Sequence, residues 1–169
     1  MDAYSMQYMQ AVDLSNMAHQ KQMQRQWQDS IDLYRQCLRL RVEIGAPERS
    51  VAVPLVNGAD SFAELKMFDE AEKWAREGLA IRRCCNDVDV RAAEECLEDV
   101  HKGRSKAGLP PSDWQALRRT FCSNLGCVNK GKLSVCVRCR TAKYCSSECQ
   151  KVDWRYVHKK ACKESGRSQ

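Results

Sequence analysis

The stretch FCSNLGCVNKGKLSVCVRCRTAKYCSSECQKVDWRYVHKKAC, residues 121–162, decides the fold of the C-terminal third of the chain. It holds seven cysteines and one histidine, residue types that bind zinc in proteins. They are Cys122, Cys127, Cys136, Cys139, Cys145, Cys149, His158 and Cys162. Eight such ligands fill two tetrahedral zinc shells, and they pair at gaps of four, two, three and three residues. A two-residue gap lets one turn direct two sulfurs at one ion, and a three-residue gap places two ligands one helical turn apart.

A disulfide framework is the alternative explanation of so many cysteines. Residues 1–20 lack the charged start, apolar run and cleavage site of a secretory signal peptide. We therefore expect that the protein is not secreted and resides in a reducing compartment. Thiols at this density in a reducing compartment indicate metal binding. Seven thiols also cannot all pair with one another, whereas seven thiols and one histidine fill two sites. We therefore expect two structural zinc ions with no open coordination position.

The zinc ions are also needed for folding. About forty residues with few large apolar side chains are too small for a self-supporting core. Structural zinc contributes about 10–16 kcal/mol in zinc-finger peptides, which can replace the missing core. We expect metal binding and folding to be one event in residues 120–163.

The spacing Cys-x4-Cys-x8-Cys-x2-Cys-x5-Cys-x3-Cys-x8-His-x3-Cys, with YCS at 144–146 and CQKVDW at 149–154, resembles the MYND zinc finger. The first gap, the gap before the fifth ligand and the gap before the histidine are longer than in many members, which lengthens loops without removing a ligand. The resemblance implies interleaved sites, in which ligands of the two zinc ions alternate in pairs along the chain. The first zinc would bind Cys122, Cys127, Cys145 and Cys149, and the second Cys136, Cys139, His158 and Cys162. Spacing alone also permits a sequential arrangement of the first four and last four ligands.

The resemblance further implies a groove for proline-containing peptides on the finger. The family's glutamine and tryptophan in this groove correspond to Gln150 and Trp154. A third groove position, often serine, is Val137 here, and this change removes a side-chain hydrogen bond to the ligand. Core packing against the zinc ligands is the alternative role for Trp154. Short hairpins that brace two metals also leave a strand edge that accepts extended peptides.

The two parts of the chain differ in charge. Residues 112–169 carry a formal charge of +9 before thiolates and zinc are counted, and residues 1–111 carry −3. The lysines and arginines of the finger are dispersed, and there is neither a groove-reading Cys2His2 helix nor a set of stacking aromatics. We therefore expect the main partner to be a protein and not a nucleic acid.

The remainder of the chain predicts helices with an internal repeat. WQDSIDLYRQCL, residues 27–38, aligns with FDEAEKWAREGL, residues 68–79, at an offset of 41 residues. Small residues recur at matching positions, where they let a neighbouring helix approach closely. This pattern resembles the second helix of a tetratricopeptide repeat, with a longer period than usual. We expect helices near residues 3–24, 27–44, 48–66, 69–84 and 87–103, with Asn57-Gly58 marking a bend or a close contact.

The predicted fold class is mainly α: an antiparallel tetratricopeptide-like array followed by a small α+β zinc-stabilised finger. We expect an array over 1–103, a linker over 104–111, a docking helix over 112–121 capped by Ser112, the finger over 122–162 and a disordered tail over 163–169. Leu109-Pro110-Pro111 in the linker loosely resembles a proline-rich ligand. Cys37 aligns with Gly78 and is expected to be a small packing residue.

These features predict a protein–protein interaction adaptor in the cytoplasm or nucleus, which recognises an extended proline-containing peptide at the finger and a second partner on the helices. Saturated zinc sites and the absence of nucleophile–base, phosphate-loop or dinucleotide motifs argue against an enzyme. No apolar run approaches the eighteen residues of a membrane span. Two alternatives stay open, a nucleic-acid-associated transcriptional regulator and an accessory subunit of a chromatin or ubiquitin enzyme. The sequence leaves the oligomeric state and the binding face of the helices undetermined.

Overall fold

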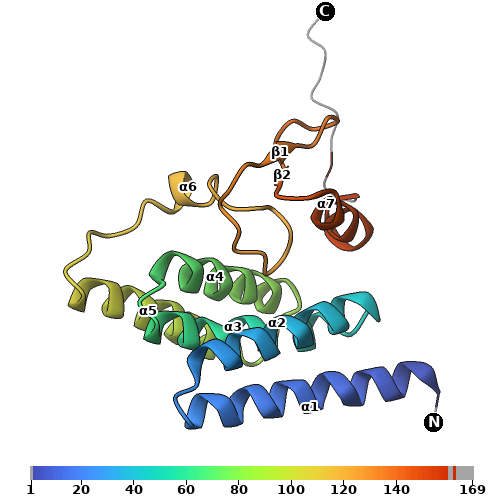
Figure 1. Cartoon of the computed structure of the whole chain (residues 1–169), viewed down its shortest axis with the longest axis horizontal. Coiled ribbons are helices and arrows are strands. Elements are labelled where there is room, and N and C mark those ends of the chain that lie inside the picture. Colours follow the sequence, from blue (N-terminus) through green and yellow to red (C-terminus); the bar gives the residue numbers. More distant parts are fainter. Residues whose placement is uncertain (1, 160–161, 163–169) are drawn as a thin grey trace, which may run out of the picture. The chain divides into compact units, whose positions relative to one another are not determined.

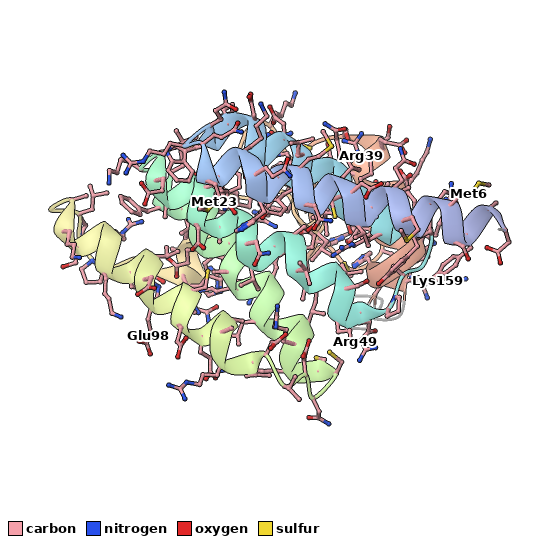
Figure 2. The ribbon with its side chains drawn as sticks, turned by 90° about the horizontal axis from the view of Figure 1, so that it is seen from below. Met6, Met23, Arg39, Arg49, Glu98 and Lys159 are labelled. Atoms are coloured by element: carbon pink, nitrogen blue, oxygen red, sulfur yellow. The ribbon has the colours of Figure 1, made fainter. Side chains whose placement is uncertain are left out.

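The computed structural model describes residues 2–159 and 162, and the chain divides into two compact units, Met1–Ser112 and Asp113–Gln169. The first unit contains five helices; each packs against the next and is joined to it by a short turn (Figure 1). They are α1 (Ala3–Met23), α2 (Trp27–Glu43), α3 (Glu48–Glu64), α4 (Phe68–Cys84) and α5 (Val90–Lys106). In Figure 2, α1, α3 and α5 lie side by side in one layer, with α2 and α4 behind them. The predicted helical array is confirmed.

The predicted repeat is visible in the backbone. Both α2 and α4 begin at the aligned aromatic residue and are 17 residues long. The turns before them place Arg25 and Lys66 in the left-handed region, and the turns after them place Gly45 and Asn86 there. Each of these residues is followed by an N–H that bonds a carbonyl five positions earlier, which is the Schellman ending of a helix. The same turns therefore recur at the same offset as the helices.

Glycines in the array admit close neighbours, as the sequence indicates. A Cβ on Gly58 of α3 would lie 2.3 Å from Cζ3 of the buried Trp74. A Cβ on Gly78 of α4 would lie 2.6 Å from Cγ2 of Val56. Asn57-Gly58 is thus a close contact between α3 and α4 and does not interrupt the helix. Cys37, the repeat equivalent of Gly78, is fully buried and donates its thiol to the carbonyl of Ala11, 3.1 Å away.

A buried arginine compensates for a proline within α3. Pro54 has no N–H, so it cannot bond the carbonyl of Ser50 one turn earlier. The guanidinium of Arg41, only 5% exposed, donates a hydrogen bond to that same carbonyl. Arg41 of α2 therefore satisfies a backbone group that the helix itself leaves without a donor.

The last helix differs from its expected bounds. It begins at Val90, so Asp87 and Asp89 precede it, and it continues to Lys106, into the predicted linker. Gly103 does not end the helix but packs against Phe68, whose Cε1 would lie 3.0 Å from a Cβ at that position. The helix stops where Gly108 takes a positive φ of 74°, and residues 109–113 then have no regular structure.

The second unit is small and contains short elements. They are α6 (Trp114–Leu117), β1 (Ser134–Val135), β2 (Lys143–Tyr144), α7 (Ser147–Asp153) and the π-helical turn η1 (Trp154–His158). The strands pair antiparallel, with Ser134 opposite Tyr144. The predicted docking helix is shorter than expected and is capped by Asp113, whose carboxylate accepts from the Ala116 N–H, instead of by Ser112. The predicted tail, residues 163–169, lies outside the described residues.

Candidate metal centres and peptide-binding edge

The first metal centre brings together four cysteines that span much of the finger. Cys122 and Cys127 belong to the loop after α6, Cys145 follows β2, and Cys149 lies in the first turn of α7. The sulfur of Cys127 is 3.7 Å from that of Cys145 and 3.9 Å from that of Cys149, and the latter two are 3.5 Å apart. Sulfurs at 2.3 Å from a tetrahedral zinc lie about 3.8 Å from one another. The donor set therefore fits a zinc ion with four thiolates.

The second centre combines three cysteines with the histidine. Cys136 and Cys139 flank the turn after β1, His158 ends η1, and Cys162 follows it. Nε2 of His158 is 3.4 Å from the sulfur of Cys136 and 3.5 Å from that of Cys139, and the sulfurs of Cys136 and Cys162 are 4.0 Å apart. A tetrahedral zinc with ordinary bond lengths separates such a nitrogen and sulfur by about 3.6 Å. This donor set also fits zinc, and the interleaved arrangement is the one that the structure adopts.

Local hydrogen bonds favour the thiolate form of one cysteine in each centre. The thiol of Cys127 donates to the sulfur of Cys122 and lowers the pKa of Cys122 to about 5. The backbone N–H of Cys139 points at Cys136 and lowers the pKa of Cys136 to about 6. Each centre thus already contains a cysteine whose anionic form is stabilised.

Further polar groups hold the ligands in place; the quoted motif stretches include Tyr144, Ser146 and Asp153, but the sequence assigned them no role. Nδ2 of Asn129 lies 3.4 Å from the sulfur of Cys145, where the side-chain amide can donate to a thiolate. The hydroxyl of Tyr144, 2% exposed, donates to the carboxylate of Asp153 over 2.7 Å and so ties β2 to α7. Ser146 caps α7 by accepting from the N–H of Cys149 at 3.1 Å. A serine three residues before a ligand is a sequence signal that would have indicated this cap.

The three predicted peptide-binding residues lie on different elements. Gln150 and Trp154 are half-buried, four residues apart, at α7 and the start of η1. The Trp154 indole packs on the imidazole of His158, with ring centroids 5.8 Å apart. Trp154 therefore has the packing role that was its alternative, while part of its surface stays exposed. Val137 is 88% exposed, two residues after β1.

One strand edge of the finger is open among the described residues. Strand β2 is covered on both sides, by β1 and by Ser123, whose N–H donates to the Lys143 carbonyl over 2.7 Å. Strand β1 pairs with β2 alone, and both of its residues are exposed. Val135 on this strand is 49% exposed. An extended peptide has backbone groups to pair with at this edge and exposed apolar side chains beside it.

A thiol and an imidazole of α5 have partners on other helices of the first unit. The thiol of Cys96 is 3.5 Å from the Val56 carbonyl, and burial raises the pKa of Cys96. His101 lies 3.3 Å from a buried carboxylate oxygen of Glu72, a contact between helices that sequence spacing does not reveal. Among residues 2–159 and 162, no helix has the length and apolarity required to cross a bilayer.

Comparisons with known proteins agree with this geometry. The family model "MYND finger" matches residues 120–162, and the model "Tetratricopeptide repeat" matches residues 9–83. "Programmed cell death protein 2" of Mus musculus is 37% identical over 67 residues, which cover 33% of this chain and 19% of that protein. No solved structure matches the chain at a significant level. The chain therefore carries a tetratricopeptide repeat region followed by a zinc-binding MYND finger, two modules of protein–protein interaction.

Proposed function

We propose that the protein is an adaptor whose finger binds an extended proline-containing peptide along the outer edge of β1. The observation that carries this proposal is the open edge of β1, next to the exposed side chains of Val135 and Val137. A peptide added there gains backbone hydrogen bonds from the strand and apolar contacts from the two valines.

Trp154 and Gln150 would complete the groove. The indole is half-buried against His158, so its orientation is fixed before a ligand arrives. An ordered aromatic surface suits a proline ring, because little side-chain entropy is lost on contact. The amide of Gln150, one turn earlier, can both donate to and accept from a peptide backbone.

The two zinc centres would serve this groove by fixing its walls. The first centre ties the strand hairpin to the start of α7, and the second ties the turn after β1 to η1. The strand edge and the indole are thereby held on elements that share metal ligands. Ordering them in advance lowers the entropic cost of binding.

The test uses the zinc-loaded full chain and a phage-displayed library of twelve-residue peptides with a fixed central proline. The best binder is measured by fluorescence anisotropy against the wild type, Trp154→Ala and the matched control Trp114→Ala in α6. We expect Trp154→Ala to weaken binding at least about tenfold, as loss of a central aromatic anchor does, while the control binds like the wild type. Both variants should retain two zinc ions per chain. Unchanged binding by Trp154→Ala would show that the groove is wrongly placed.

Salt dependence separates this proposal from a nucleic-acid role. Contacts to phosphates weaken by about 10³–10⁵ between 50 and 200 mM salt when six to ten are made. Peptide binding through apolar contacts and backbone hydrogen bonds should change little over the same range. A peptide affinity that fell as steeply as phosphate contacts do would favour the basic face of the finger as the binding surface.

A further inference from the structure

The segment that follows α5 is held on the helical array in an extended form. Gly108, with its positive φ, turns the chain, and the N–H of Leu109 bonds the carbonyl of Arg104 over 3.2 Å. Pro110 and Pro111 then keep the chain extended, because neither can donate a helical hydrogen bond. We call Leu109–Ser112 the strap.

Arg104 of α5 binds the backbone of the strap. Its Nε donates to the carbonyl of Pro110 over 2.7 Å. Its Nη1 lies 2.7 Å from the carboxylate of Asp69 at the start of α4, and the side chain is only 16% exposed. The ion pair fixes the guanidinium, so the donor that faces the strap is ordered in advance.

Glu72 of α4 binds the end of the strap. The Glu72 side chain is fully buried, and one of its oxygens accepts the hydroxyl of Ser112. The other oxygen lies 2.8 Å from the guanidinium of Arg76 and 3.3 Å from Nε2 of His101. A hydrogen bond to a buried carboxylate is stronger than one between neutral groups. This residue therefore recognises a hydroxyl at one defined position.

The strap does not fill the site that holds it. A cavity of about 230 Å³ lies beside it, lined by Arg76, His101, Arg104, Ser105, Leu109, Pro111 and Ser112. The cavity wall thus combines basic and hydroxyl groups of the array with apolar atoms of the strap itself. A ligand longer or bulkier than Leu-Pro-Pro-Ser has space here.

We propose that this face of α4 and α5 is a docking site for an extended proline-containing segment with a hydroxyl residue at its end, and that the strap occupies it in cis. The proposal goes beyond the proposed function, because it gives the helical array a binding site of its own. A tethered segment competes at an effective concentration of the order of millimolar. A partner segment must displace it, so the strap sets the affinity that a partner needs.

Hydrogen exchange of the zinc-loaded full chain tests the seating of the strap. Ser112→Ala removes the hydroxyl that Glu72 accepts, and Ser105→Ala, at the same cavity, is the matched control. We expect the amides within residues 107–113 to exchange at least about tenfold faster in Ser112→Ala, the value for loss of a hydrogen bond to a charged group. The control should exchange like the wild type. Equal exchange in the two variants would overturn the proposal.

A binding experiment tests the site in trans. The probe is a fluorescein-labelled synthetic peptide with the sequence of residues 107–113. It is titrated with the triple variant Leu109→Gly, Pro110→Gly, Ser112→Gly, after circular dichroism has checked that this variant keeps the helical content of the wild type. We expect at least tenfold tighter binding to this variant than to the wild type, and loss of the gain when Glu72→Gln is added. Equal affinity for the wild type and the glycine variant would contradict the site. Failure here would leave the Trp154 dependence of the finger unchanged, so the two proposals fail separately.

Discussion

Gly58→Ala tests how closely the repeat helices pack. A methyl group at this position would lie 2.3 Å from Cζ3 and 2.7 Å from Cε3 of Trp74, and 3.3 Å from Cδ2 of Tyr34. Carbon atoms in contact are about 3.5–4.0 Å apart, so the indole and α3 must separate by more than about 1 Å. Trp74 has no free space to move into, because it is fully buried and its ring packs edge-on against Phe62 with centroids 5.0 Å apart.

Two opposing effects decide the magnitude. Replacing a glycine inside a helix by alanine stabilises the helix by about 1 kcal/mol. Overpacking a rigid core costs about 1–3 kcal/mol, and the short distances here place the cost at the upper end. We therefore expect Gly58→Ala to lower the free energy of unfolding by about 1–2 kcal/mol. For a unit of this size, that corresponds to a fall in Tm of roughly 5–12 °C.

Urea unfolding followed by circular dichroism at 222 nm measures the change, since the first unit contains most of the helix. Trp74→Leu provides the internal control, because it removes the ring atoms that the new methyl would meet. In the Trp74→Leu background, Gly58→Ala should lose its cost and show the helical gain instead, a coupling of at least about 1 kcal/mol. A Gly58→Ala protein as stable as the wild type would refute the close approach of α3 and α4.

Two more predictions concern the buried arginine and the zinc ligands. Arg41→Met leaves the Ser50 carbonyl without its side-chain donor and should lower the free energy of unfolding in urea. In a Pro54→Ala background a backbone N–H replaces that donor, so we expect the loss caused by Arg41→Met to be about 1–3 kcal/mol smaller there. Equal losses in the two backgrounds would contradict the assignment. Cys136→Ser should remove the second zinc and its folding energy, so that the finger loses protease resistance, whereas Cys84→Ser, outside both centres, should keep two ions by native mass spectrometry.

Much of the architecture could be predicted because it depends on local patterns. The offset between residues 27–38 and 68–79 located α2 and α4 correctly, since aromatic, small and apolar positions recur in both. Ligand spacing located the metal centres for a similar reason, because the two ligands of each pair lie close in sequence, on one chain turn or one turn of helix. Which pairs share an ion depends on how β2 and α7 fold back on the earlier loop. For that step the family resemblance was needed, and the structure agrees with it.

The rest depends on contacts between distant residues. Nothing near Gly103 signals that it packs on Phe68, so the sequence favoured a helix end that the structure does not have. The Arg41 contact that compensates for Pro54 joins two helices, as does the contact between Glu72 and His101. The strap was likewise expected to be a linker. Its prolines show that the segment is not helical, but they do not show which residues of the array the extended segment contacts.

The number of zinc ions bound by the intact chain tests the central claim most directly. Native mass spectrometry of the protein purified without chelator should show two zinc ions per chain, and excess EDTA should remove both together with the ordered structure of residues 120–159. A single bound ion, or a finger that stays folded after both ions are removed, would contradict the conclusion that two metal centres replace an apolar core in this part of the protein.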